Sequence, residues 1–151
     1  MRLGIHSSTP AKFRRVMAGL AVFLVATASP ALAQPEGKLA IELNKLTQED
    51  AACRFYFLLE NGTEYALTDV TVEFAFFDTD GIFAYRNLFS FGKLGATRNK
   101  LTSFTLEQLR CPQVGRVLLN EVINCGLPEA VDIDCDALVT IRHRTGAAFV
   151  R

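Results

Sequence analysis

Apolar and polar side chains alternate along most of the chain beyond residue 37. In the stretch KLAIELNK, Leu39, Ile41 and Leu43 fall on one face and Glu42 falls on the other. The stretches CRFYFLLEN and DVTVEFAF repeat this pattern. Alternation with a period of two is typical of a strand that is buried on one face only. No stretch of useful length has the period of a helix, so the pattern predicts an all-β domain.

Turn-forming residues separate the alternating runs at the short intervals that are typical of antiparallel sheets. About seven short strands in a domain of this size predict a single antiparallel β-sandwich of the immunoglobulin-like class. One helical turn is possible in TLEQLR, because Thr105 and Gln108 have the spacing of a capping box. Beyond the three runs above, we expect strands at Ile82–Phe91, Asn99–Leu106, Val114–Asn124 and Leu138–Arg144. The expected turns lie at Asn61-Gly62, Asp80-Gly81, Gly92 with Gly95, Pro112, Gly126 to Pro128 and Thr145-Gly146.

The first 33 residues have a different pattern, which is typical of a cleavable signal peptide. Basic residues around Arg14 precede the uncharged apolar run Val16–Ala28, and the sequence ALA at 31–33 has the small-x-small form that signal peptidase cleaves. We therefore expect cleavage between Ala33 and Gln34. Since the apolar run is much shorter than the roughly 20 residues that span a bilayer, we expect no membrane insertion after removal of the signal.

The arginine pair within this segment leaves the export route open. Arg14-Arg15 resembles a twin-arginine signal, but Phe13 and Met17 depart from that motif, and a basic segment of the general secretory route explains the pair equally well. Either route leads to the periplasm or to secretion. The sequence therefore predicts a signal peptide at 1–33 and one domain at 34–151.

Removal of the signal changes the charge balance. The full chain has 16 basic and 16 acidic residues, but the signal holds four of the basic ones and none of the acidic ones, which leaves twelve against sixteen. A chain with a net charge near −4 lacks the clustered Lys and Arg that bind nucleic acid. Ten phenylalanines after residue 33 predict a folded core rather than disorder.

All four cysteines follow the signal. An even number in an exported chain predicts two disulfides, for which three connectivities are possible. The spacings match no zinc-binding pattern, and only one histidine remains after the signal is removed. The expected disulfide-bonded residues are Cys53, Cys111, Cys125 and Cys135.

One stretch resembles a known kind of module. It is similar to the opening strands of immunoglobulin-like modules in exported bacterial proteins, including the FxLYD type, and its sequence is YFLLENGTEYALTDVTVEFAFFDTDG. In those modules a strand ending in Asn is followed by a short link, a long Val/Phe strand and a D-x-D-G hairpin. The whole chain after the signal is also similar to small uncharacterised periplasmic proteins with twin-arginine-like signals. The resemblance spans residues 38 to about 125. It implies a fold and a compartment, and it implies no catalytic residue.

The sandwich also suggests how the cysteines pair. Cys53 opens the second expected strand and Cys111 precedes the sixth, and these strands run in the same direction in this topology, so both residues lie at one end of the sandwich. Cys125 and Cys135 flank a short excursion after the sixth strand. We therefore expect disulfides between Cys53 and Cys111 and between Cys125 and Cys135. The phase of Cys125 along its strand also allows a bond to Cys53.

Two acidic motifs were considered as calcium sites. In an EF-hand loop with Gly81 as the sixth residue, Phe76 would be the first and Asn87 the twelfth, and neither can supply the required carboxylate. Asp80-Gly81 between apolar runs predicts a hairpin turn instead, since both residues accept a positive φ. In VDIDCDAL, Asp132, Asp134 and Asp136 would share one side of an extended segment and could in principle bind calcium. We expect a solvated acidic loop here instead of a metal site, with its charge neutralised by the RHR sequence at 142–144.

Few residues of the chain suit catalysis. The single remaining histidine is His143, and neither Ser90 nor Ser103 stands in a Gly-x-Ser-x-Gly elbow. The carboxylates of Glu60 and Glu73 could serve as an acid–base pair, but glutamates on strand faces are usually solvated. No phosphate loop, dinucleotide motif or haem-attachment motif occurs. We therefore expect no catalytic residue, no metal site and no cofactor.

The aromatic hairpin offers a candidate partner surface. Phe76 and Phe77 are adjacent, so a regular strand sends them to opposite faces, and Phe83 and Tyr85 in the next strand are expected to share a face. If Phe77 lies outside beside Phe83 and Tyr85, the hairpin presents an apolar patch. The alternative is that a loop such as Gly92–Lys100 covers this face.

These observations predict a non-enzymatic, exported β-sandwich that binds another envelope protein through the aromatic hairpin or an exposed strand edge. Two alternatives remain: a small periplasmic hydrolase that uses carboxylates or His143, and a purely structural homo-oligomer. The sequence does not determine the oligomeric state.

Overall fold

The computed structural model describes Met1, residues 37–129 and residues 131–151. The chain divides into two units, Met1–Ala31 and Leu32–Arg151, and all secondary structure described below belongs to the second. Apart from Met1, the expected signal peptide and its cleavage site at Ala33 and Gln34 lie outside the described residues. The elements are β1 (Leu39–Glu49), β2 (Ala52–Asn61), β3 (Leu67–Asp78), β4 (Phe83–Leu94), β5 (Asn99–Leu106), η1 (Cys111–Gln113), β6 (Val114–Asn124), α1 (Cys135–Leu138), β7 (Val139–His143) and β8 (Ala148–Val150).

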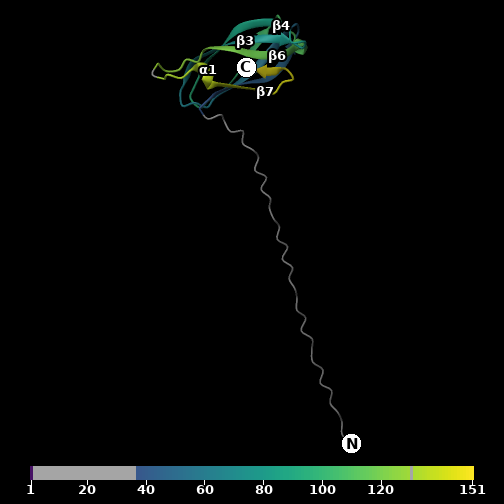
Figure 1. Ribbon diagram of the computed structural model, residues 1–151. Coiled ribbons are helices and arrows are strands. Elements are labelled where there is room, and N and C mark those ends of the chain that lie inside the picture. The colour runs from purple at the N-terminus through teal and green to yellow at the C-terminus, as the bar shows by residue number, and fades with distance from the viewer. Residues whose placement is uncertain (2–36, 130) are drawn as a thin grey trace. The chain divides into compact units, whose positions relative to one another are not determined.

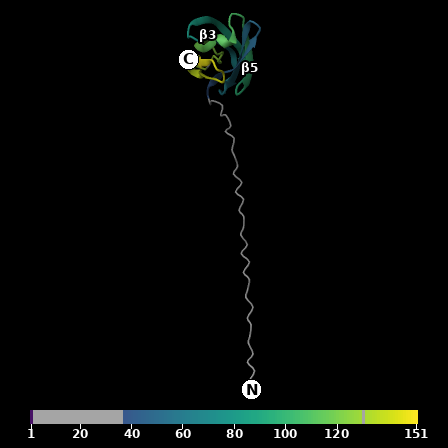
Figure 2. The ribbon, with the colours of Figure 1, turned by 90° about the vertical axis from the view of Figure 1, so that its right-hand side faces the viewer.

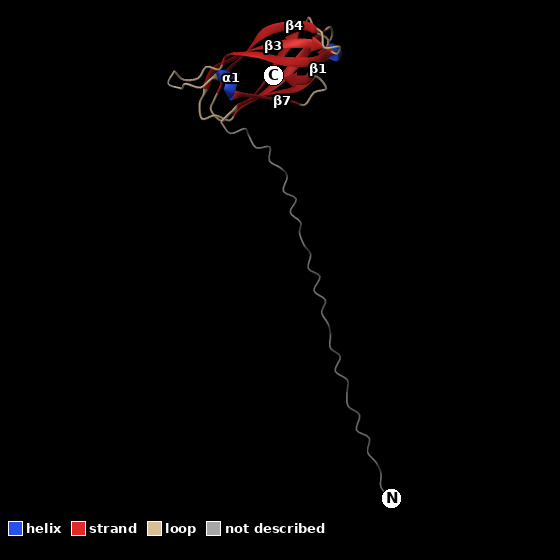
Figure 3. Ribbon diagram, viewed as in Figure 1, coloured by secondary structure: helices blue, strands red, loops and turns tan. Residues whose placement is uncertain are grey.

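The strands form two four-stranded sheets, as the alternating pattern predicted, and in the described part of the chain helix is confined to two short segments (Figure 3). Sheet A has the order β5-β2-β1-β7, and sheet B has the order β4-β3-β6-β8. Figures 1 and 2 show the two layers, with β3 and β5 in different sheets. The all-β sandwich is therefore confirmed.

The C-terminal segment differs from a simple antiparallel arrangement. The chain leaves β6 in sheet B, enters sheet A as β7 beside β1, and returns to sheet B as β8 beside β6. Both pairings are parallel, whereas the four other pairings are antiparallel. The strand β8 follows the turn at Thr145-Gly146 and was not predicted, because three residues are too few for alternation to be recognised.

Phenylalanines from both sheets fill the space between them. Phe57 of sheet A stacks on Phe74 of sheet B at a centroid distance of 4.9 Å, and Phe55 meets Phe76 edge to face at 5.0 Å. These four side chains are at most 1% exposed. Each buried ring contributes about 1.5–3 kcal/mol through burial of apolar surface, so the interlocked rings are a major source of stability.

The cysteines form two disulfides, Cys53 with Cys111 and Cys125 with Cys135. These are the pairings expected from the sandwich topology, and the alternative bond between Cys53 and Cys125 is not formed. Disulfides of this kind are typical of proteins that fold in an oxidising compartment. They therefore indicate a location outside the cytosol.

The loop after β2 is organised by a buried asparagine. Asn61 is fully buried, and its amide nitrogen donates to the carbonyl oxygens of Tyr65 at 2.8 Å and Gly95 at 2.9 Å. Its amide oxygen accepts hydrogen bonds from the backbone N–H of Thr63 at 3.0 Å and from the Thr63 hydroxyl at 2.7 Å. The Asn61-Gly62-Thr63 sequence thus joins the β2–β3 loop to the β4–β5 loop through hydrogen bonds.

Two local expectations were wrong. The helical turn that TLEQLR allowed is replaced by a single turn at Glu107 and Gln108, closed by the Leu109 N–H bond to the Leu106 carbonyl at 3.4 Å, because residues through Leu106 belong to β5. A 3-10 turn forms later, at Cys111–Gln113, where Pro112 presets the backbone. The segment around Asp134 is not fully extended, because α1 begins at Cys135.

Candidate functional site

The turn of the β3–β4 hairpin is held together by hydrogen bonds among its own residues. Asp78 accepts hydrogen bonds through its side-chain oxygen Oδ1 from the backbone N–H groups of Asp80 at 3.0 Å and Ile82 at 2.8 Å. Gly81 has a φ of 81°, and its N–H donates to the Asp78 carbonyl at 3.1 Å. Asp80 is not among the residues with positive φ, so only the glycine uses the freedom that the sequence suggested for both.

An aromatic and cationic contact lies on the outer face of this hairpin. The rings of Phe77 and Phe83 meet edge to face at 6.1 Å. Arg116 stands opposite Phe77 in the β3–β6 register, and its guanidinium carbon lies 4.5 Å from the Phe77 ring centroid. Phe77 is half-buried, whereas Phe83 is 56% exposed. The hairpin therefore presents an aromatic surface with a cation placed on it.

Phe83 and Tyr85 do not share this surface, which corrects the sequence expectation. Phe76 of β3 pairs with Tyr85 of β4, but the next residue, Phe77, pairs with Phe83, so Ala84 is an extra residue in β4. The Tyr85 ring consequently packs beside Phe76 at 6.3 Å and contacts the core cluster. A β-bulge of this kind redirects side chains that strict alternation would place together.

Further apolar residues extend the surface across sheet B. Ala75 stands opposite Leu118 of β6, and Leu118 stands opposite Val150 of β8. Leu88 of β4 stands opposite Glu73 and is 52% exposed. We call this outer surface of sheet B the hairpin face, formed by Ala75, Phe77, Phe83, Leu88, Leu118, Val150, Arg86 and Arg116.

The loop that was considered as a cover for this face lies elsewhere. Thr97 donates its N–H to the Thr63 carbonyl, and Arg98 accepts a hydrogen bond from the N–H of Asn61, so the β4–β5 loop packs against the end of β2. Gly92 pairs with Val70 near the start of β3, whereas the hairpin turn follows the end of β3. The Gly92–Lys100 segment is therefore at the opposite end of sheet B from Phe77.

The outer face of sheet A has a different chemistry. Glu42 is 2% exposed and receives hydrogen bonds from Arg142 and Arg144, each at 3.0 Å, and from the Asn44 amide at 2.7 Å. Arg142 also bonds the carboxylate of Glu60. Glu42, Asn44, Glu60 and the two arginines thus bind one another, and this network stabilises sheet A.

Burial and hydrogen bonding act in opposite directions on Glu42. Burial alone would raise the pKa of its carboxyl group, but the hydrogen bonds from Asn44 and Arg144, together with the positive charges of Arg144 and Arg142, lower the pKa below its ordinary value. The carboxylate is therefore ionised at neutral pH and is stabilised by the fold.

The residues that could serve in hydrolysis are separated. Glu60 lies on β2 in sheet A and contacts Arg142, whereas Glu73 lies on β3 in sheet B and accepts a hydrogen bond from Asn120 at 2.5 Å. His143 is exposed at the end of β7, with its ring Nδ1 3.2 Å from the Thr145 carbonyl.

The two serines lie away from this histidine. Ser103 is on β5, at the opposite edge of sheet A from β7, and Ser90 is on β4 in sheet B. Ser90 donates a hydrogen bond to Asp69 at 3.2 Å. The fold thus brings neither Ser90 nor Ser103 to His143.

The aspartates near the second disulfide have separate roles. Asp134 caps α1 by accepting a hydrogen bond from the N–H of Asp136 at 2.9 Å, and Asp136 forms an ion pair with Arg151 at 2.5 Å. The residues of the RHR sequence do not neutralise this segment as expected, because Arg142 and Arg144 bind Glu42. Within the described residues no group of three potential ligands, Asp132 included, is placed to hold a metal ion.

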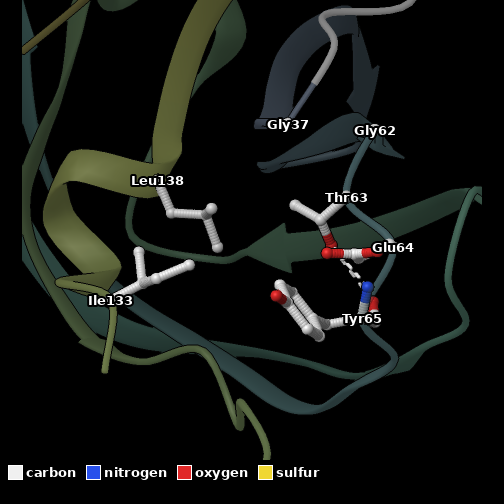
Figure 4. Close-up of a pocket in the computed structure, with 7 residues that line it drawn as sticks. All are labelled: Gly37, Gly62, Thr63, Glu64, Tyr65, Ile133 and Leu138. Atoms are coloured by element: carbon white, nitrogen blue, oxygen red, sulfur yellow. Dashed lines mark hydrogen bonds between the residues drawn. The ribbon is translucent and has the colours of Figure 1, made fainter. Parts of the chain in front are cut away.

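A shallow hollow of about 380 Å³ lies beside α1 (Figure 4). The side chains of Ile133 and Leu138 face Tyr65 across it, and Thr63 and Glu64 complete the wall. The neighbouring Glu64 carboxylate raises the pKa of the Tyr65 hydroxyl by hydrogen bonding and by its charge. Thr63 is buried but already hydrogen-bonded to Asn61 and Tyr65, so the hollow has no buried polar group left to orient a ligand.

Comparisons with known proteins support the fold alone. No protein-family model matches the chain, and no curated protein matches its sequence. Among solved structures, the chain is similar to that of IrmA from Escherichia coli, with a TM-score of 0.52 and 15% identity over 69% of this chain and 90% of that chain. In the described part of the chain, no helix has the length and apolar character needed to span a membrane.

Six of the eight residues of the hairpin face were missed by the sequence analysis, which named only Phe77 and Phe83. Leu88 and Arg116 each lie on the polar phase of their strands, and alternation alone gives no reason to single them out. The position of Arg116 over Phe77 depends on the register between β3 and β6, which has three irregularities. Leu118 likewise joins the face only through its pairing with Ala75.

Proposed function

We propose that this protein is an exported, non-enzymatic β-sandwich that binds another protein of the cell envelope, in the manner of immunoglobulin-like modules of exported bacterial proteins. Its two disulfides and the signal peptide predicted at 1–33 support export to the periplasm or beyond. The partner binds to the hairpin face.

A single observation carries this proposal. The hairpin face combines the exposed side chains of Phe83 and Leu88 with the half-buried ring of Phe77, and no other described segment covers them. Contiguous exposed apolar surface is costly in water and marks interaction sites in soluble proteins. Aromatic residues and arginine, both present here, are enriched where such sites contribute most to binding.

The apolar face is a better candidate than the adjacent strand edge. β4 is an edge strand of sheet B, and edge strands can accept an additional strand from a partner. However, the side chain of Asn87 already accepts the N–H of Leu88 at 2.9 Å, and the Lys100 ammonium group bonds the carbonyl oxygen of Phe91 at 2.6 Å. Side chains thus occupy part of this edge, whereas the hairpin face is open.

Crosslinking in intact cells followed by mass spectrometry tests the proposal. The wild-type protein should form a crosslink to one envelope protein, and the double variant Phe83→Ser with Leu88→Ser should lose it. Leu101→Ser is the matched control, because Leu101 is a 61% exposed leucine on β5 in the other sheet. A crosslink that survives the double variant, or crosslinks to other copies of the chain alone, would contradict the assignment.

A further inference from the structure

We infer that the partner segment bound by the hairpin face is acidic as well as apolar, with a carboxylate that binds Arg116. This inference rests on the proposed function and names the chemistry of the partner.

Arg116 is held in a defined position but has an unused hydrogen-bonding capacity. Its guanidinium group lies over the Phe77 ring at 4.5 Å, and its neighbour on the other side, across the β6–β8 pairing, is the small residue Ala148. Arg116 is exposed, and within the described residues no carboxylate lies within ion-pair distance of it. A guanidinium plane that is stacked on a ring keeps its N–H edges free to donate to a carboxylate in a bidentate pair.

Several other arginines differ from Arg116 because the fold already gives them an anion. Arg142 binds Glu42 and Glu60, Arg144 binds Glu42, and Arg151 binds Asp136. On the sheets themselves, Arg54 of β2 likewise pairs with Glu49 of β1 at 2.9 Å. An arginine without a carboxylate is therefore unusual on the outer faces of the two sheets.

Arg86 supplies a second cation at the rim of the same face. Its side chain is 66% exposed, and its Nε lies 3.8 Å from the Glu73 carboxylate, the other oxygen of which accepts the Asn120 amide. Only the arginine of this pair is exposed, since the Glu73 side chain is 17% exposed, but the contact is long for an ion pair and the Asn120 amide remains bound to Glu73 when Arg86 moves away. Arg86 can therefore exchange Glu73 for a partner's carboxylate at small cost.

The spacing of the two arginines suits one partner segment. Arg116 lies on β6 opposite Phe77, and Arg86 lies on β4 opposite Ala75. With strands ~4.8 Å apart and a rise of ~3.3 Å per residue, the two Cα atoms are about 12 Å apart. Acidic residues four positions apart in an extended segment span a similar distance, ~13 Å, with apolar residues between them that contact Phe77.

Charge disfavours other occupants of the face. The chain after residue 33 has sixteen acidic against twelve basic residues, and Asp78 and Asp80 form the tip of this same hairpin. A bilayer is an extended anionic surface that would meet the carboxylates of this tip together with the arginines, whereas a short peptide segment can reach Arg116 and Arg86 without contacting the tip. A symmetric contact with a second copy repeats the same patch on both sides and would bring like arginines together.

Peptide selection tests the inference directly. Random linear peptides are displayed and selected on the exported, oxidised protein, and the dissociation constants of the recovered peptides are measured. We expect recovered peptides to combine Asp or Glu with Phe, Leu or Ile. Arg116→Gln should weaken their binding about tenfold, as for loss of a charge-assisted hydrogen-bonded pair, and Arg116→Lys should weaken it less. Arg98→Gln is the matched control, since Arg98 is an exposed arginine in the β4–β5 loop and should leave binding unchanged.

Several outcomes overturn the inference. The inference is wrong if the recovered peptides are apolar and lack acidic residues, or if acidic peptides bind Arg116→Gln as tightly as the wild type. It is also wrong if Phe83→Ser weakens the binding of none of the recovered peptides. Binding to vesicles of phosphatidylglycerol but not of phosphatidylcholine, lost in Phe83→Ser, would assign the face to a membrane instead. If the crosslink in cells depends on Phe83 while the peptides lack acidic residues, the proposed function stands and only this inference fails.

Discussion

Replacement of Asn61, the last residue of β2, by alanine should destabilise the protein strongly, because its side chain holds two loops together. Asn61 is fully buried, and its side chain makes hydrogen bonds to three residues in two different loops. Alanine removes the donor for the carbonyl oxygens of Tyr65 and Gly95 and the acceptor for the N–H of Thr63. The N–H of Thr63 then has no acceptor, whereas the carbonyl oxygens of Tyr65 and Gly95 each keep one other donor, the Thr63 hydroxyl and the N–H of Arg98.

The expected loss follows from these hydrogen bonds. The unpaired N–H of Thr63 costs about 1–3 kcal/mol, and each of the two lost bonds to a carbonyl oxygen that keeps another donor costs about 0.5–1 kcal/mol. We therefore expect the free energy of unfolding to fall by about 2–5 kcal/mol. For a domain of this size, ~1 kcal/mol corresponds to about 4 °C in the melting temperature, so the shift should be roughly 8–20 °C.

Urea unfolding of the oxidised protein, followed by far-ultraviolet circular dichroism, measures this loss. The midpoint should fall while the slope of the transition stays constant, because the variant still exposes the same surface on unfolding. Asn120→Ala is the control, since Asn120 is an exposed asparagine with one hydrogen bond, to Glu73. If Asn61→Ala were no less stable than Asn120→Ala, the hydrogen-bond account of the two loops would be wrong.

Three further predictions concern the two sheets and their core. The fold lowers the pKa of Glu42, so its ionised carboxylate stabilises the protein at pH values above the ordinary pKa of 4.5. This stabilisation is lost as the pH falls below 4.5 and through the lower pKa of the folded state. In acid-unfolding curves, the wild type should therefore lose its advantage over Glu42→Gln below about pH 4.5. Gly115→Ala should cost at least about 2 kcal/mol, since a Cβ would lie 2.4 Å from the Asp78 carbonyl oxygen, whereas Gly146→Ala, with nothing within 4 Å, should have almost no effect in the same urea assay. Phe57→Ala should cost about 3–5 kcal/mol and give a lower urea midpoint, and an unchanged midpoint would contradict the packing of Phe57 at the centre of the core.

The strands and the hairpin were predictable because their determinants are local. Alternation in KLAIELNK and CRFYFLLEN reports directly which face of a strand is buried, and Leu39 and Phe57 are indeed fully buried. The Asp80-Gly81 turn depends on only a few neighbouring residues, so the sequence was sufficient to locate it. The disulfide between Cys53 and Cys111 followed once the order of the strands was assumed, since only that order brings these cysteines to one end of the sandwich.

Features that depend on pairing between distant strands were not predictable. The bulge opposite Phe76 places Phe83 and Tyr85 among different neighbours, although their spacing alone suggests a shared face. Arg142 and Glu42 are 100 residues apart, and only the parallel pairing of β1 with β7 makes them partners. The hairpin face likewise exists only after β3, β4, β6 and β8 have assembled, so its arginines carried no signal in the sequence.

Photocrosslinking at single positions tests the central claim, that the hairpin face binds another envelope protein. A photoreactive amino acid is placed at Phe83 or, as a control of similar exposure on the other sheet, at Leu101. In intact cells, irradiation should produce a discrete adduct with one other protein from position 83 and none from position 101. Equal adducts from both positions, or none from position 83, would contradict the account.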